Sequence, residues 1–220
     1  LTPPTSGTGF ASTNPWYDAS VVTVSAGSFN SVSKSNTVAA QNIAILAANQ
    51  PLGAFQMDVR GEAITVQQMV FYAQVTGNLV SNITNVSLVD GNGTVVAGPV
   101  DGSGAAVSGS FTFTDTVTFP VGSTVLRLQG QLGSTYASND TIIASTTPND
   151  DWSTITGVDT GESVALTSFT SAITANTMTV KAGALAINVS SQPTARNVIA
   201  GATGFEFARY VLDASQSGED

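Results

Sequence analysis

The side chains best suited to chemistry are carboxylates in the polar stretch 148–162. Four acidic residues stand within it: Asp150, Asp151, Asp159 and Glu162. Hard cations such as Ca²⁺ bind several carboxylate, amide and carbonyl oxygens, usually on loops. A second candidate is the pair Asp58 and Glu62. The sequence therefore predicts Ca²⁺ at these two places, with solvated loop acids as the alternative interpretation.

The sequence contains few residues suited to catalysis. The chain contains neither histidine nor cysteine, so a serine nucleophile has no histidine base and thiol catalysis is excluded. Glycoside hydrolysis needs two carboxylates facing each other across a cleft, and nothing in the sequence pairs two of the fifteen acidic residues in that way. We therefore expect a protein that is not an enzyme.

Two further groups of residues indicate binding or modification. Trp16, Tyr136 and Trp152 are the stacking residues that an adhesin or carbohydrate-binding module would use. The sequence also contains five Asn-x-Ser/Thr sequons, which predict glycosylation on exposed loops of an exported protein. Their asparagines are Asn82, Asn85, Asn92, Asn139 and Asn188.

Composition and charge limit the partners. Six basic residues against fifteen acidic ones give a net charge of −9. The basic residues are scattered, whereas a nucleic-acid groove needs clustered cations, so we expect no nucleic-acid partner. No apolar run reaches the roughly 18 residues of a membrane helix, so we expect no membrane insertion in this segment. Only 10% of the residues are charged, which is typical of Ser/Thr/Asn-rich surface modules and favours an extracellular, cell-surface location.

The elements that must position these residues are predicted to be strands. Short β-branched runs are separated by Gly, Asn, Asp and Ser, which indicates an all-β fold. Asp90-Gly91-Asn92-Gly93 predicts a hairpin turn, and residues 110–119 alternate between apolar and polar side chains. The Ala-rich stretch 38–48 has helical propensity, but we expect an extended strand at 42–46. We also expect a strand at 163–166 and a long polar connection at 148–162.

The C-terminal stretch repeats an earlier one. Thr179-Val180-Lys181-Ala182-Gly183 resembles Thr23-Val24-Ser25-Ala26-Gly27. In the same way, Tyr210-Val211-Leu212-Asp213 corresponds to Phe55-Gln56-Met57-Asp58. Gly218-Glu219 likewise matches Gly61-Glu62, so the predicted Asp58 and Glu62 site has a counterpart in the second copy. The sequence therefore predicts an extended arm at 1–20, a β-sandwich module at 21–177 and the start of a second module at 178–220.

A family resemblance rests on residues of this second copy. Val180-Lys181-Ala182-Gly183-Ala184-Leu185, Val198-Ile199-Ala200-Gly201, Phe205-x-Phe207 and Gly218-Glu219-Asp220 resemble tandem immunoglobulin-like repeats of large prokaryotic cell-surface proteins. Such proteins form surface layers or filaments, or act as adhesins. The resemblance implies an immunoglobulin-like β-sandwich followed by a partial second β module.

Together these features suggest a structural subunit. A partial β module cannot bury its own apolar face or pair its own edge, so we expect a neighbour to complete it by adding a strand. The partner would be another copy, giving a polymeric homo-oligomer such as a filament or surface layer, with calcium stiffening the junctions. The predicted interface residues are Phe205, Phe207, Tyr210 and Leu212. The alternative is the adhesin or carbohydrate-binding module.

Overall fold

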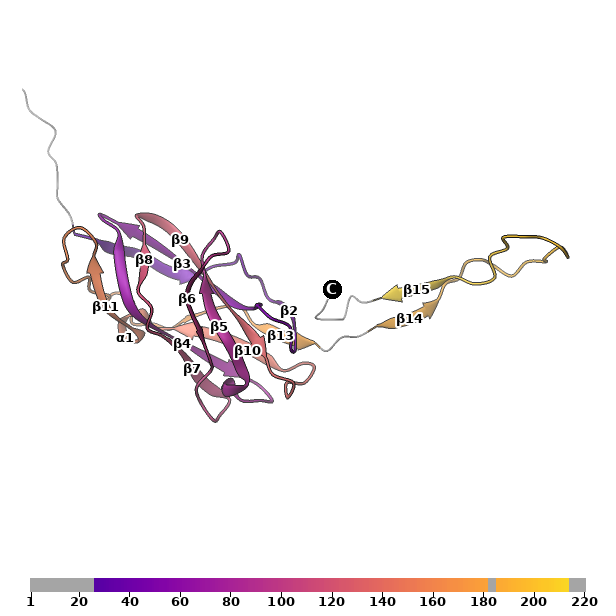
Figure 1. Cartoon of the computed structure of the whole chain (residues 1–220), viewed down its shortest axis with the longest axis horizontal. Helices are drawn as coiled ribbons and strands as arrows, with labels where there is room; N and C mark the ends of the chain where they lie inside the picture. Colours follow the sequence, from indigo (N-terminus) through magenta and orange to yellow (C-terminus); the bar gives the residue numbers. More distant parts are fainter. Residues whose placement is uncertain (1–25, 182–184, 214–220) are drawn as a thin grey trace, which may run out of the picture.

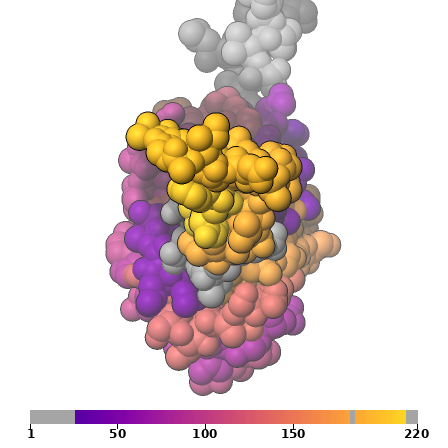
Figure 2. All heavy atoms as spheres, turned by 90° about the vertical axis from the view of Figure 1, so that its right-hand side faces the viewer, coloured from indigo at the N-terminus to yellow at the C-terminus, as the bar shows by residue number. Residues whose placement is uncertain are grey.

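A computed structural model describes residues 26–181 and 185–213, which form a β-sandwich and a separate C-terminal hairpin (Figure 1). Almost all the regular structure is strand, which confirms the predicted all-β fold. The immunoglobulin-like assignment stays a prediction, and the arm at 1–20 lies outside the described residues. Seen from its own end, the hairpin stands in front of the sandwich (Figure 2).

The first sheet of the sandwich has five strands, and every neighbouring pair is antiparallel. In spatial order they are β1 (Ser28–Lys34), β3 (Gln50–Arg60), β9 (Gly122–Leu132), β5 (Ile83–Val89) and β6 (Val95–Val100). A short 3-10 helix, η1 (Val80–Asn82), leads into β5. β3 therefore lies inside the sheet, with β1 on one side and β9 on the other.

The second sheet is built around the long strand β4 (Ile64–Val75). Its main path runs β11 (Trp152–Gly157), β4, β10 (Thr141–Thr146), β13 (Met178–Lys181) and β2 (Gln41–Ala44). Three further strands complete it: β7 (Ser108–Phe113) and β8 (Val117–Phe119) pair with β4, and β12 (Ile173–Thr174) pairs with β10. The helix α1 (Pro148–Asp151) joins β10 to β11.

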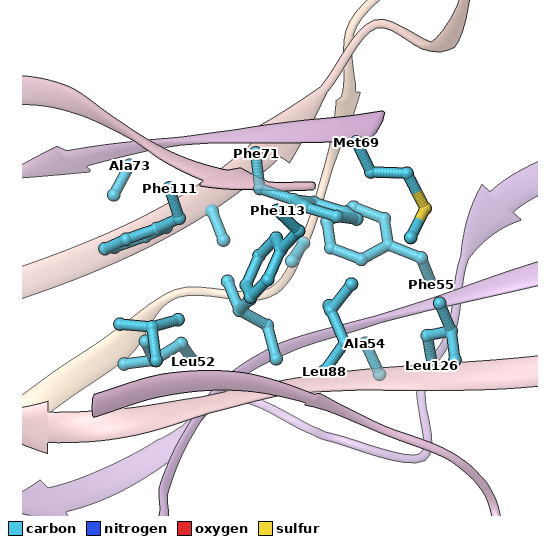
Figure 3. Close-up of a cluster of buried hydrophobic side chains, with 14 of the residues drawn as sticks. Leu52, Ala54, Phe55, Met69, Phe71, Ala73, Leu88, Phe111, Phe113 and Leu126 are labelled. Carbon is cyan, nitrogen blue, oxygen red and sulfur yellow. The ribbon is translucent and has the colours of Figure 1, made fainter. Parts of the chain in front are cut away.

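The core lies between the two sheets. Phe55 of β3 and Phe71 of β4 are fully buried, with ring centroids 5.1 Å apart, and Phe113 of β7 meets Phe71 edge-on at 6.0 Å (Figure 3). Burying a side chain of this size stabilises the fold by about 1.5–3 kcal/mol. The predicted alternation at 110–119 is confirmed, because Phe111, Phe113, Val117 and Phe119 are all buried.

The predicted hairpin turn is also confirmed. The Asp90 carboxylate accepts hydrogen bonds from the backbone N–H groups of Asn92 and Thr94, both at 2.8 Å. Gly93 has φ +88°, a conformation that favours glycine. Those contacts lower the pKa of Asp90, with the Thr94 N–H as the largest cause. Asp90 and Asn92 therefore form a turn, as the spacing of these residues indicated.

Residues 148–166 differ from the prediction. The stretch expected to be a polar connection contains α1 and strand β11, and β11 pairs with β4 from Trp152 opposite Met69 to Gly157 opposite Ile64. The predicted strand at 163–166 is wrong, since only an isolated bridge between Thr156 and Ser163 forms there. Four of the six β11 residues are strand-favouring Trp, Thr or Ile, and pairing with the central strand β4 orders them as a strand.

Strand β13 belongs to the sandwich, although the repeated sequence begins with it. It runs antiparallel to β10 and parallel to β2, with Val180 opposite Ile43. Met178 and Val180 are fully buried in the core. The sandwich thus continues through Lys181, past the predicted boundary at 177, because β13 fills the space between β10 and β2.

Candidate functional site

The C-terminal hairpin and its loop carry all four predicted interface residues. It consists of β14 (Ala186–Val189) and β15 (Tyr210–Asp213), paired antiparallel with Ile187 opposite Leu212 and Val189 opposite Tyr210. Residues paired across an antiparallel ladder project to the same side of the sheet, and neighbours along a strand project to opposite sides. Each face of the hairpin is therefore defined by alternate residues.

One face of this hairpin is apolar and open to solvent. We call it the open face, and it consists of Ile187, Val189, Tyr210 and Leu212, which are 62%, 72%, 61% and 65% exposed. The opposite face carries Ala186, Asn188, Val211 and Asp213. Sequence reasoning found Tyr210 and Leu212 but missed Ile187 and Val189, although the alternation in Ala186-Ile187-Asn188-Val189 was a usable signal.

The loop between the two strands holds the other two predicted residues. The Phe205 and Phe207 rings meet edge-on at 5.2 Å, and the Arg196 guanidinium lies 4.6 Å from the centre of the Phe205 ring. Phe207 is exposed, whereas Phe205 is half-buried. Arg209 forms an ion pair with Glu206 at 2.9 Å. The structure gathers all four predicted residues on this one element, and their contact with a partner stays a prediction.

Glu62, predicted as a cation ligand, is a buried hydrogen-bond acceptor in the structure. Its Oε1 accepts from Gly27 N–H at 3.2 Å and from the Thr160 hydroxyl at 2.6 Å, and its Oε2 accepts from the N–H groups of Asp159 and Thr160 at 2.7 and 2.9 Å. These bonds, led by the Thr160 hydroxyl, lower the pKa of Glu62 to about 2. Both oxygens are used to fasten the loop after β11 to the start of β1.

Asp58, the other member of that predicted pair, has different partners. Its Oδ2 accepts from Asn30 Nδ2 at 2.7 Å and forms an ion pair with Arg60 at 3.0 Å. The hydrogen bond from Asn30, followed by that from Arg60, lowers the pKa of Asp58. This carboxylate therefore links β1 to the end of β3. Its repeat counterpart Asp213 lies on β15, and Glu219 lies outside the described residues.

The acidic stretch 148–162 is spread over three elements. Asp150 and Asp151 lie in α1, where the Asp151 carboxylate accepts a hydrogen bond from Thr147 N–H and burial raises its pKa. Asp159 and Glu162 are exposed in the turn after β11. Within residues 26–181 and 185–213, no three His, Cys, Asp or Glu side chains form a group suited to a metal. Calcium binding stays a prediction.

The aromatic residues expected to stack on sugars are in the core. Trp152 is buried, lies parallel to the Phe119 ring with centroids 6.2 Å apart, and donates from Nε1 to the Thr146 hydroxyl at 3.0 Å. Tyr136 is buried too and donates to the Leu79 carbonyl at 2.9 Å. This corrects their assignment as a platform, because neither ring has a free face. Trp16 lies outside the described residues.

The five sequon asparagines differ in their surroundings. Asn82 donates to Asn78 Oδ1 at 2.6 Å, Asn85 donates to Gln131 at 3.4 Å, and Asn139 accepts from Lys181 at 2.6 Å. Asn92, at the tip of its turn, and Asn188, on the hairpin face opposite the open face, are both exposed. Asn85 and Asn139 are exposed as well, whereas Asn82 is half-buried, and modification at all five stays a prediction.

Comparison with known proteins gives little support to any assignment. No family model matches the chain, and no curated protein matches it. Similar solved structures include AvmM, which catalyses macrocyclization in alchivemycin A biosynthesis, with 9% identity and a TM-score of 0.33 over 63% of this chain and 82% of that one. A DUF4466 family protein from Parabacteroides merdae has 11% identity and a TM-score of 0.30 over 78% and 53% of the two chains. Similarity this low carries no argument about fold or function.

Among residues 26–181 and 185–213, no helix is long and apolar enough to span a membrane.

Proposed function

We propose that this chain is a structural subunit of an extracellular assembly, a filament or surface layer, whose neighbours are joined through the C-terminal hairpin by strand complementation. The open face carries the proposal. Ile187, Val189, Tyr210 and Leu212 project on one side of a two-stranded ribbon that stands apart from the sandwich core (Figure 1). A contiguous exposed apolar face of this kind marks an interaction surface.

The energetics of a hairpin favour completion by a partner. A two-stranded hairpin is at best marginally stable alone in water, and further strands or a packed layer are needed to stabilise it. Burying each of the four side chains would contribute about 1.5–3 kcal/mol, from which the costs of association are subtracted. Completion by a neighbour would therefore stabilise both the hairpin and the contact.

The position of the hairpin favours a head-to-tail arrangement. It projects beyond the β13 end of the sandwich, so a subunit would present it to a different surface of the next subunit. Such a contact propagates into a filament unless the rotation between subunits closes a ring. The low content of charged residues and the resemblance to surface-protein repeats support an extracellular setting.

The alternative function, an adhesin or carbohydrate-binding module, is less well supported, because its described stacking residues are not available to a sugar. Trp152 and Tyr136 were its described stacking candidates, and both are buried. Sugar stacking needs an exposed aromatic face. The open face is mostly aliphatic, which suits a protein partner better than a sugar.

The test compares two neighbouring residues on β15. Leu212→Asp puts a charge on the open face, whereas Val211→Asp puts the same charge on the opposite face, and both side chains are exposed in the isolated chain. We expect the wild type and Val211→Asp to associate in sedimentation velocity and to form polymers in electron micrographs, and Leu212→Asp to remain monomeric. A monomeric wild type, or two variants that behave alike, would overturn the proposal. Repeating the run with a chelator tests the predicted calcium.

A further inference from the structure

Three features of the C-terminal hairpin reproduce the first hairpin of the sandwich at one constant displacement of 155 residues. β1 and β3 pair Ser31 with Asp58 and Val32 with Met57, and β14 and β15 pair Ala186 with Asp213 and Ile187 with Leu212. The next two pairs, Ser33 with Gln56 and Lys34 with Phe55, correspond in the same way to Asn188 with Val211 and Val189 with Tyr210.

The backbone beyond the ladder repeats as well. Ser35 N–H donates to the Ala54 carbonyl at 2.9 Å, and Ser190 N–H donates to the Arg209 carbonyl at 2.8 Å. The Ser35 hydroxyl accepts from Thr37 N–H at 3.3 Å, and the Ser190 hydroxyl accepts from Gln192 N–H at 3.1 Å. The two hairpins thus share both their register and the local structure that follows the first strand.

This equivalence identifies the edge of the second hairpin that no strand of the described residues covers. Backbone groups along a strand point alternately to its two neighbours. Because the Ala54 and Arg209 carbonyls point toward β1 and β14, the backbone groups of Phe55 and Met57 point toward β9, and those of Tyr210 and Leu212 point away from β14. The edge that Tyr210 and Leu212 present is thus the one that β9 covers in the sandwich.

We infer that the hairpin is completed by a β9-type strand from a neighbouring subunit, added antiparallel to β15 in the register that β9 has on β3. This inference rests on the proposed function and specifies the partner. In the sandwich, Phe55 lies opposite Leu126, Gln56 opposite Val125 and Met57 opposite Thr124. Phe55 and Gln56 correspond to Tyr210 and Val211, 155 residues later in the sequence. In the same register, the incoming strand therefore places its Leu126-type residue opposite Tyr210 and its Val125-type residue opposite Val211.

The chemistry of the incoming strand follows from β9 itself. Leu126, Leu128 and Leu132 are buried on its core side, and Val125, Arg127 and Gln129 alternate with them on the other side. The partner is therefore an extended segment that places a Leu126-type residue opposite Tyr210 and a Thr124-type residue opposite Leu212, and so continues the open face. β9 of a folded copy already pairs with β3 and β5, so the neighbour must supply another strand of this type.

Disulfide trapping on the full chain tests the register, and the chain has no cysteine of its own. Gln56 and Val125 form a non-hydrogen-bonded pair by the alternation above, and such pairs have Cα atoms about 4.5 Å apart, which suits a disulfide. The protein carries Val211→Cys, which leaves the open face unchanged. The probes are synthetic peptides of residues 122–132 with cysteine in place of Val125, or, as controls, in place of Ser123 or Arg127.

The in-register peptide should form the mixed disulfide at least about tenfold faster than either control peptide, since diagonal neighbours lie about 7–8 Å apart. Adding Leu212→Asp should remove that advantage. Equal rates for all three peptides would overturn the inferred register. If self-association still depends on Leu212 but no peptide is trapped in register, this inference fails and the proposed function stands. If the wild-type chain does not associate, the proposed function fails independently.

Discussion

The hairpins β1–β3 and β14–β15 have the same pairing in opposite environments. In the first, Phe55 and Met57 are fully buried, whereas their counterparts Tyr210 and Leu212 are largely exposed. The two hairpins have the same pairing register, and the same backbone hydrogen bond follows the ladder at the loop end of each. The repeated sequence therefore gives the same strand pairing in both places, whereas the burial of the side chains depends on the strands packed around each hairpin.

The connections within the two hairpins also differ. Between β1 and β3 the chain forms β2, which pairs with β13 at the edge of the second sheet. The counterparts of the buried β2 residues Ile43 and Ala44 are Val198 and Ile199, which are exposed and lie outside any strand. A second sheet is needed to order this connection as β2, so strand formation here is a tertiary effect.

The largest expected effect comes from truncating equivalent aromatic residues. Phe55→Ala removes a ring that packs on Phe71, and we expect it to lower the free energy of unfolding by about 3–5 kcal/mol. Tyr210→Ala should change it by less than about 0.5 kcal/mol, because that side chain is exposed. Urea unfolding of the monomeric protein measures both. A large loss for Tyr210→Ala would mean that the hairpin packs on the sandwich.

A smaller effect should separate sandwich stability from association. The buried Thr146 hydroxyl donates to the Val70 carbonyl at 2.9 Å and accepts from Trp152 Nε1, so Thr146→Val leaves two buried groups without this partner. We expect a loss of about 1–3 kcal/mol in unfolding free energy. Association through the hairpin, measured by sedimentation below the melting temperature, should be unchanged. Thr146→Ser is the control because it keeps the hydroxyl.

The third effect depends on pH and is confined to the sandwich. The pKa of Glu62 is lowered from 4.5 to about 2, so its contribution to stability is fully present above pH 4.5 and is lost as the pH falls toward 2. Glu62→Gln should therefore lower the Tm most above pH 4.5, and the two Tm curves should converge near pH 2. A constant difference across this range would contradict the assigned hydrogen bonds.

The smallest effect is expected in the loop of the hairpin. Arg209 and Glu206 form an exposed ion pair, and such pairs contribute at most about 1 kcal/mol. Arg209→Ala should leave the unfolding free energy and association nearly unchanged, with Arg209→Lys as the charge-retaining control. If Arg209→Ala abolishes association, the partner binds the loop rather than the open face.

Sequence reasoning recovered what depends on local pattern. The Asp90 turn and the alternation around Phe111 and Phe113 follow from neighbouring residues, and the correspondence of β15 to β3 follows from the repeated sequence. It failed where long-range pairing decides the structure. β11 was missed because it lies in an acidic stretch with few apolar residues, and its partner β4 is far away in the sequence. The hydrogen bonds that the fold brings to Glu62 were also not predicted, and calcium binding stays a prediction.

The position of β13 has a mechanical consequence for any assembly built through the hairpin. Tension applied to the hairpin would reach the sandwich at Lys181 and act along β13, which is bonded to β10 on one side and β2 on the other. A load parallel to a strand strains its ladder bonds together in shear, whereas a load across the strand breaks them one after another. The subunit is therefore anchored by the geometry that best resists being pulled apart.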